Sequence, residues 1–254
     1  PEELHDLLGD LRGALDRPDA EGWRLSADAR ERYRERIRLG FSGQERPLTV
    51  AELRVFLRQG LTKVDAGISK AFDRSRGLYA GYFYHQVSAY TTTQRSPTTV
   101  TPKRWTRHTL PVFLEGMVCA LRLTRDPARA RTLHQAVKKS PLYDRALRMY
   151  RVCDSLAAES LEIGRCRVFN PGWLENQSIW LHMEYKYLLE LFRCGLYEEF
   201  YEELFAVLIP FQPPRRYGRS ILENSSFLVS SAYADPALHG NGFVARLSGA
   251  TAEF

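Results

Sequence analysis

The segment Asn176–Phe192 reads NQSIWLHMEYKYLLELF and carries large apolar side chains on nearly every side of a helical projection. A helix that is hydrophobic all round is packed on all sides, so this segment predicts a buried central helix. Asn170-Pro171-Gly172 breaks the chain just before it.

Helical periodicity and capping residues predict further helices on both sides of this segment. A Thr49-x-x-Glu52 capping box and Asp126-Pro127 each indicate a helix start. No alternation of strands with helices appears, so a parallel sheet is not expected. The expected helices are Glu2 to Leu15, Ala27 to Leu39, Leu48 to Phe72, Leu110 to Leu123, Asp126 to Lys139, Ser140 to about Met149, and Tyr197 to Ile209.

One region departs from the helical pattern. Leu78 to Tyr90 is aromatic and β-branched between glycines, which predicts a short hairpin or an ordered loop. The Thr/Ser/Pro-rich stretch Thr91 to Thr109 reads as a long connection. The expected fold class is therefore all-α, with one irregular hairpin or loop insertion.

The amino-acid composition excludes several classes of protein. The chain has 254 residues, of which 44% are hydrophobic and 26% charged, which excludes a disordered, collagenous or coiled-coil protein. No uncharged apolar run reaches the ~18 residues of a spanning helix, so no membrane contact is expected from this segment. Four cysteines lie far apart without a C-x-x-C pair, which favours buried thiols in a reducing, cytoplasmic compartment.

The net charge of +6 matches one acid-free stretch between Arg74 and Leu114, which holds six lysines and arginines beside several tyrosines. Cations interleaved with aromatic rings are one way to hold single-stranded nucleic acid. Other arginines alternate with acids, as on a solvated helix face. We therefore predict no nucleic-acid partner.

The first chemically distinctive segment is Gly172–His182, GWLENQSIWLH. If the central helix begins here, His182 follows Glu175 by two turns on one face, ~10 Å along the axis. A carboxylate, an imidazole and aromatic rings in one cleft suit a sugar and a phosphate. The alternative is that Glu175 or Asn176 caps the helix, while His182 and the tryptophans Trp173 and Trp180 belong to the core.

A second segment runs from Tyr217 through Glu223, Asn224 and a run of serines to the glycines near His239. Small hydroxyl residues after glycine can bind an oxyanion, although the signal is weak alone. Nucleotide-binding glycine motifs, H-E-x-x-H, ligand clusters of His and Cys, and G-x-S-x-G are all absent from the sequence. We therefore expect no metal site, no hydrolase triad and no cofactor.

The segment Pro171–His182 resembles a motif of the cellobiose phosphorylase family, which is glycoside hydrolase family 94. That motif reads P-G-x-[KR]-E-N-G-G-x-x-x-H, and the segment aligns with it without a gap. Leu174 stands at the basic position, and Gln177-Ser178 stands at the glycine pair. Leu247–Ala252 is similar to the family's L-[TN]-G-[ST]-A with a slip of one residue. The family's D-W-N-D motif, which carries its general acid, does not occur in this sequence.

The resemblance implies that residues 1–254 are one fragment of a larger catalytic domain and are truncated at both ends. This fragment is expected to form the later part of an (α/α)6 helical toroid. The apolar, uncapped run Leu247 to Phe254 also indicates a longer protein. The catalytic acid is unknown and is expected in a preceding part of the same chain, and the fragment alone is expected to be inactive. The candidate sugar-binding residues are Trp173, Glu175, Asn176, Trp180, Tyr217, Glu223 and Asn224, and the candidate phosphate-binding residues are His182, Ser248 and Thr251.

The activity that the resemblance implies is phosphorolysis of a β-linked glucan or oligosaccharide, with inorganic phosphate as co-substrate and inversion at the anomeric carbon. Two alternatives remain open. One is a hydrolase or transglycosylase on the same fold, and the other is a non-catalytic sugar-binding or scaffold domain.

Overall fold

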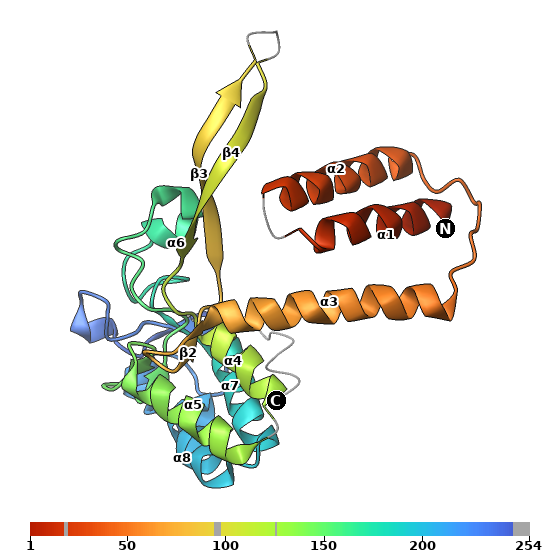
Figure 1. Cartoon of the computed structure of the whole chain (residues 1–254). Helices are drawn as coiled ribbons and strands as arrows, with labels where there is room; N and C mark the ends of the chain where they lie inside the picture. Colours follow the sequence, from red (N-terminus) through yellow and green to blue (C-terminus); the bar gives the residue numbers. More distant parts are fainter. Residues whose placement is uncertain (18–19, 94–97, 125, 246–254) are drawn as a thin grey trace. The chain divides into compact units, whose positions relative to one another are not determined.

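The computed structural model describes residues 1–17, 20–93, 98–124 and 126–245, and it divides into two compact units (Figure 1). Unit 1 comprises Pro1–Lys70 and His85–His108. Unit 2 comprises Ala71–Tyr84 and the chain from Thr109 onward. Each unit is considered by itself below.

The prediction of an all-α fold forming part of a helical toroid is wrong. Helices make up 49% and strands 18% of the structure, with four small antiparallel sheets. Three of these sheets have two strands and the fourth has three. Strands of two to four residues are too short to show a period of two in the sequence, so most of them left no pattern to detect.

Unit 1 contains three helices and a long hairpin. The helices are α1 (Glu2–Leu15), α2 (Ala20–Ile37) and α3 (Val50–Ala71), and the strands are β3 (Phe83–Thr92) and β4 (Val100–Thr109). Arg36 pairs with Glu2 and Asp6, and Arg32 pairs with Asp10, so α1 and α2 run antiparallel. The expected capping box is confirmed, because Glu52 accepts from the Thr49 backbone N–H at 2.9 Å and donates its own N–H to the Thr49 hydroxyl at 3.2 Å.

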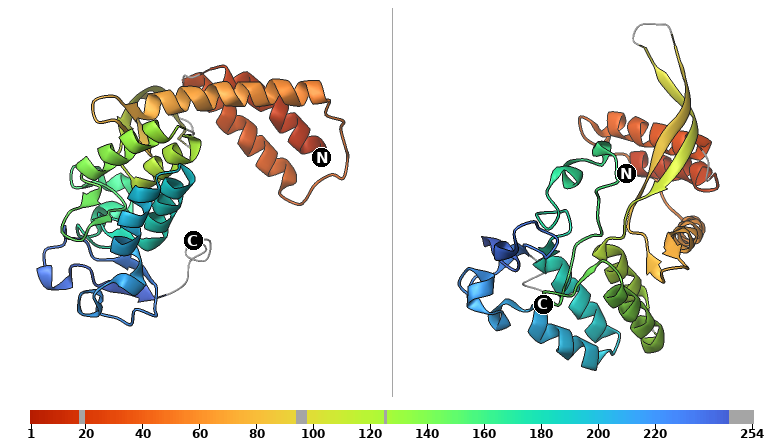
Figure 2. Two further views of the ribbon diagram at one scale, coloured as in Figure 1. Left: turned by 90° about the horizontal axis from the view of Figure 1, so that it is seen from below. Right: turned by 90° about the vertical axis from the view of Figure 1, so that its left-hand side faces the viewer.

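The hairpin of β3 and β4 corrects the expectation of a loop over Thr91 to Thr109. Figure 2 shows the two strands as a long twisted ribbon. Most of their side chains are exposed, so neither strand shows the alternation of apolar and polar residues that marks a half-buried strand. The predicted hairpin within Leu78 to Tyr90 is instead split, because β2 (Leu78–Tyr79) pairs with β1 (Phe72–Asp73).

Two helical pairs form the core of unit 2. They are α4 (Leu114–Leu123) with α5 (Pro127–Lys139), and α7 (Leu181–Arg193) with α8 (Tyr197–Val207). The backbone of Val152 accepts from Leu114 and donates to Ser178, which places the starts of α4 and α7 close together. The Cys194 thiol donates to the Leu121 carbonyl near their ends. The two helices therefore run parallel, side by side (Figure 2).

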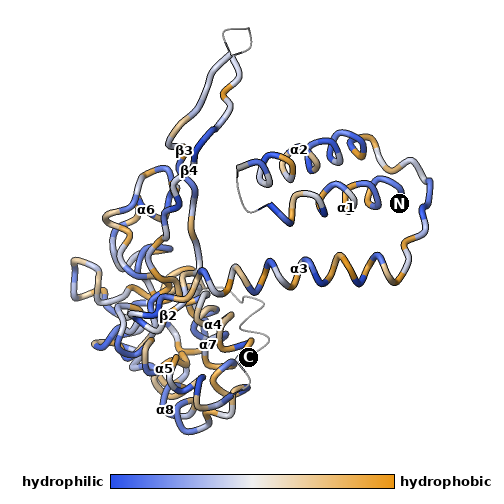
Figure 3. Tube along the Cα trace, viewed as in Figure 1, coloured by the Kyte–Doolittle hydropathy of each residue, from blue (hydrophilic) through white to orange (hydrophobic). Residues whose placement is uncertain are grey.

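Sequence signals account for the ends of these helices. Asp126 caps α5 by accepting from the Ala128 N–H at 2.9 Å, with Pro127 in the first turn as predicted. Gly195 follows α7 with φ of 76°, the left-handed conformation that ends many helices. The hydrophobic residues gather where α4, α5 and α7 lie together (Figure 3).

The central helix begins later than predicted. Helix α7 begins at Leu181, whereas residues 176–180 form a tight turn and the strand β7 (Ile179–Trp180). Strand β7 pairs with β8 (Ser225–Leu228), which pairs in turn with β9 (Gly242–Ala245). A buried strand and a buried helix share the same apolar composition, so the sequence could not separate them here.

Ser140 to Met149 forms a hairpin instead of the predicted short helix. Its strands are β5 (Tyr143–Asp144) and β6 (Met149–Tyr150). The Asp144 carboxylate accepts from the backbone N–H groups of Ala146 and Leu147, and Arg148 has φ of 58°. An aspartate that bonds to the following backbone N–H groups stabilises a turn in competition with a helix. The remaining short elements are α6 (Arg165–Val168), α9 (Pro214–Tyr217) and the 3₁₀ turns Leu161–Ile163, Ile209–Phe211 and Pro236–Leu238.

Candidate functional site

The loop 170–178 has strained backbone at two non-glycine residues. Gly172, Leu174 and Gln177 have φ of 83°, 48° and 60°. The left-handed conformation is unfavourable for Leu and Gln, and it persists where surrounding structure holds it in place. Here Gly172 donates its N–H to the Asn176 carbonyl at 2.8 Å, and Asn176 donates to the Trp173 carbonyl at 3.1 Å.

Close contact with a neighbouring segment clamps this loop. A Cβ atom at Gly172 would lie 2.5 Å from the Tyr233 nitrogen, so only glycine fits. Ser230 donates its backbone N–H to the Gly172 carbonyl at 3.2 Å. Strain of this kind is common at functional sites, which makes the loop a candidate site on structural grounds alone.

The carboxylate of Glu175 lies at the rim of this loop, with 28% of its side chain exposed. One oxygen accepts from Arg165 at 2.6 Å. The other oxygen is buried without a hydrogen-bond partner among the residues that the structure describes. The prediction that Glu175 shares a helix with His182 is wrong, because Glu175 precedes β7 and α7 begins six residues after it.

Trp180 connects the loop to His182. Its indole N–H donates to the Leu174 carbonyl at 2.8 Å, next to Glu175. Its ring meets the His182 ring edge to face, with centroids 5.4 Å apart, and stacks on Phe227 at 5.9 Å. Glu175 and His182 are thus joined through Trp180 rather than along one helix face.

His182 occupies the first turn of α7 and is half-buried. Burial lowers the pKa of its imidazole, and the neighbouring Lys186 ammonium lowers that pKa further. The carboxylate of Glu115 opposes these effects. At neutral pH the ring is therefore neutral, with one N–H to donate and a cation one helical turn away.

Sequence reasoning missed Glu115, Tyr82 and Lys186. Glu115 lies in the first turn of α4, beside the parallel α7, and accepts from the Tyr82 hydroxyl. Burial and this carboxylate raise the pKa of Tyr82 to about 12. The i, i+4 spacing of His182 and Lys186 was visible in the sequence. The parallel packing of α4 against α7 was not.

The other predicted sugar-binding residues lie further into the structure. The Trp173 ring packs against Phe227 and Phe243, with centroids 5.2 and 4.6 Å away. Tyr217 is only 1% exposed and donates its hydroxyl to the Glu223 carbonyl at 2.6 Å, so its ring has no free face for a sugar. Asn176 is buried and donates its amide to the Phe169 carbonyl at 2.7 Å.

Glu223 and Asn224 lie between α9 and β8. The Glu223 side chain is exposed and pairs with Arg219 at 2.9 Å. The Asn224 amide oxygen accepts from the Tyr185 hydroxyl of α7 at 2.8 Å. The predicted phosphate-binding residues Ser248 and Thr251 lie outside the described residues, as does the run Leu247 to Phe254.

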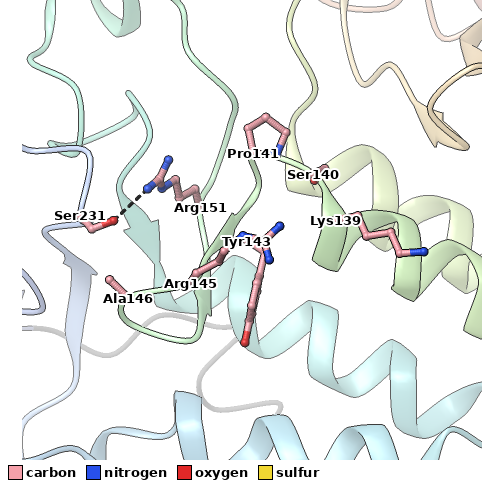
Figure 4. A pocket seen from close by; sticks show the side chains of 8 residues that line it. All are labelled: Lys139, Ser140, Pro141, Tyr143, Arg145, Ala146, Arg151 and Ser231. Atoms are coloured by element: carbon pink, nitrogen blue, oxygen red, sulfur yellow. Dashed lines mark hydrogen bonds between the residues drawn. The ribbon is translucent and has the colours of Figure 1, made fainter.

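A shallow pocket of about 460 Å³ lies elsewhere in unit 2. Arg151 donates to the Ser231 hydroxyl at 3.0 Å on one side of this pocket, whereas Lys139 extends away from them (Figure 4). Its basic side chains therefore do not converge on one point. The lining residues are Lys139, Ser140, Pro141, Tyr143, Arg145, Ala146, Arg151 and Ser231.

The described residues contain neither a candidate metal site nor a candidate membrane-spanning helix. No cluster of three or more His, Cys, Asp or Glu side chains there is placed to hold a metal ion. No helix in those ranges combines the length and the apolar composition needed to cross a bilayer.

Comparison with known proteins identifies no family for this chain. No protein-family model and no curated protein matches the sequence.

Proposed function

We propose that this chain is part of a carbohydrate-active enzyme that transfers a glycosyl unit from a β-linked glucan or oligosaccharide to inorganic phosphate. The observation that carries this proposal is the strained loop 170–178. It carries Glu175, whose side chain is 28% exposed at the rim of the loop, and it is tied through Trp180 to His182. A carboxylate, an indole and an imidazole next to a lysine are groups that bind sugar hydroxyls, sugar faces and phosphate.

The backbone conformation at Gln177 supports the resemblance to the family motif. The resembled motif has glycine at the position of Gln177, and Gln177 has φ of 60°. Glycine is the residue that adopts this conformation without steric penalty. The backbone at this position thus has a conformation that favours glycine, although the residue is Gln.

Each group has a separate role in the proposed reaction. The Glu175 carboxylate accepts hydrogen bonds from ring hydroxyls, and Arg165 holds it in place. The indole of Trp180 packs against the sugar. The neutral His182 ring donates one N–H to phosphate, and Lys186 supplies positive charge for the dianion.

The reaction exchanges one bond at the anomeric carbon for another. A phosphate oxygen attacks that carbon from the face opposite the leaving group, the glycosidic C–O bond breaks, and configuration inverts. The departing oxygen takes a proton from a carboxylic acid, and the products are a sugar 1-phosphate and a shortened glycan. The residues assembled around the loop do not include that acid.

Product analysis of the full-length protein tests this proposal. We expect sugar 1-phosphate from β-linked glucans or disaccharides only when phosphate is present. Free reducing sugar without phosphate would identify a hydrolase, and new oligosaccharides without phosphate would identify a transglycosylase. Binding without turnover would identify a sugar-binding domain, and each of these three results would contradict phosphorolysis.

A carboxamide variant tests the role of Glu175. Glu175→Gln keeps the shape of the side chain but removes the charge that accepts sugar hydroxyls, so we expect kcat/KM for the glycan to fall about a hundredfold. Glu198→Gln, on the exposed face of α8, is the matched control and should retain wild-type activity. Equal activity of the two variants would remove Glu175 from the site.

A further inference from the structure

Unit 1 contains a pocket of about 740 Å³ between α1, α2, α3 and the β3–β4 hairpin. This volume lies within the range of about 300–1,000 Å³ that is typical of sites for small organic ligands. Its lining residues are Leu11, Ala14, Leu15, Arg17, Gly22, Trp23, Ser26, Phe56, Lys63, His85, Lys103, Arg104, Trp105 and Arg107.

Two indole rings form one wall of this pocket. The Trp23 and Trp105 rings lie with centroids 5.1 Å apart at an angle of 58°. Trp23 is 53% exposed, although large apolar side chains are usually covered. The Trp105 N–H is buried without a hydrogen-bond partner among the residues that the structure describes. The wall thus offers the exposed indole ring of Trp23 to a ligand.

The rim of the pocket is strongly basic. Two lysines and three arginines line it, and none of the described lining residues is acidic. On β4, Lys103, Trp105 and Arg107 occupy alternate positions, so their side chains leave the strand on the same face as the indole wall. Positive charge and an aromatic surface are therefore presented together.

Ion pairing elsewhere in unit 1 makes this charge unusual. Arg24 pairs with Glu21 and Asp28, and Arg36 pairs with Glu2 and Asp6. Within the described ranges, by contrast, no ion pair joins Lys63, Lys103 or Arg104 to an acid. A pocket lined by one sign of charge concentrates ligands of the opposite sign.

From this arrangement we propose that the unit 1 pocket binds a nucleoside diphosphate or triphosphate. The base stacks on the exposed indole of Trp23, and the lysines and arginines at the rim bind the phosphate oxygens. Inorganic phosphate alone would leave the aromatic wall unused, and an uncharged aromatic ligand would leave the cations unused. This site is independent of the proposed glycosyl transfer, because it shares no residue with the loop 170–178 and does not include Trp180 or His182.

Titration calorimetry of the full-length protein with ADP, adenosine and pyrophosphate tests the proposal. We expect ADP to bind at least about tenfold more tightly than either part alone, because stacking and phosphate contacts both contribute. Binding of ADP should also quench tryptophan fluorescence, and Trp23→Ala should reduce both signals. No ADP binding at millimolar concentration, or equal binding of ADP and pyrophosphate, would overturn the assignment.

Charge reversal locates the site. Lys63→Glu with Lys103→Glu should weaken ADP binding by more than about tenfold, because two phosphate contacts become repulsive. Arg54→Glu with Arg58→Glu makes the same change in net charge on exposed parts of α3 outside the pocket, and should leave binding unchanged. Equal weakening by both pairs would show only non-specific attraction. Tighter binding of an oligothymidylate than of ADP would contradict a nucleotide pocket and indicate a single-strand surface.

Discussion

The helices of unit 1 and those of unit 2 are held together by different kinds of interaction. In unit 1, buried side chains are few, and α3 buries none of its residues. Its contacts include arginine–carboxylate pairs between α1 and α2 and the ring contact of Trp23 with Trp105. In unit 2, a continuous apolar core extends from Leu78 to Leu228 and includes the buried face of α7 (Figure 3).

This difference predicts different sensitivities. Burial of apolar surface is the main favourable contribution to folding, whereas exposed ion pairs contribute little and are screened by salt. Core truncation and backbone clashes should therefore affect unit 2 strongly. Changes to the charged contacts of unit 1 should have small, salt-dependent effects.

The largest effect is expected from a cavity beside the central helix. Leu188 is fully buried in the core, so Leu188→Ala should lower the free energy of unfolding of unit 2 by about 4 kcal/mol. Leu57→Ala, on α3, is the matched control because Leu57 is 53% exposed. Denaturant unfolding followed by circular dichroism measures both variants, and equal losses would refute the comparison.

The next largest effect is expected from the clamped loop. Gly172→Ala should destabilise unit 2 by about 2–3 kcal/mol, because the new Cβ would collide with the Tyr233 backbone and φ is 83°. Gly195→Ala provides the control, since Gly195 also has positive φ, 76°, but nothing lies within 4 Å of its added Cβ. Its loss should be near 1 kcal/mol, the effect of backbone conformation alone. Equal losses in thermal unfolding would show that the contact with Tyr233 is unimportant.

A pH effect of intermediate size is expected from His134 of α5. Burial, and secondarily Lys138, lower the pKa of His134 to about 4. In the unfolded chain the ring takes up a proton near pH 6.5, so the folded state loses stability as pH falls from 6.5 to 4, by roughly 1 kcal/mol per pH unit. Burial raises the pKa of Glu184, which acts in the opposite direction.

The difference between wild type and His134→Gln isolates this contribution, because Glu184 is present in both proteins. We expect denaturation midpoints of the two proteins to converge or cross between pH 6.5 and pH 4. Parallel curves over this range would mean that folding leaves the pKa of His134 unchanged.

The smallest effect is expected from the ion pairs of unit 1. Arg36→Ala removes contacts with Glu2 and Asp6 on the surface of α1 and α2, and should lower the thermal midpoint slightly in dilute buffer. The difference should vanish at 1 M salt, where the screening length is about 3 Å. A loss that persists in high salt would show that packing of the arginine stem is responsible.

Local signals in the sequence were sufficient to predict helices whose ends are marked by capping residues. The predicted Glu2 to Leu15 matches α1, and the Thr49 capping box and the Asp126-Pro127 start are both present. These features depend on residues within one or two turns of each other. They need no knowledge of tertiary contacts.

Predictions failed where distant residues decide the conformation. The segment before Leu181 is a turn and a strand because β8 pairs with β7, and the segment around Asp144 turns because that carboxylate also accepts from Ser231. For the candidate site, Glu175, Trp180 and His182 were proposed from their residue types and order. Glu115, which accepts from Tyr82, comes near His182 only through the parallel packing of α4 on α7, and no spacing in the sequence shows that packing.

Phosphate dependence of the full-length protein tests the central claim about the loop 170–178 and His182 most directly. Initial rates of sugar 1-phosphate formation would be measured over a range of phosphate concentrations for wild type, His182→Gln and the distant control His5→Gln. Loss of the imidazole contact should raise KM for phosphate about tenfold or more in His182→Gln, with little change in KM for the glycan. A KM for phosphate equal in all three proteins would contradict the account.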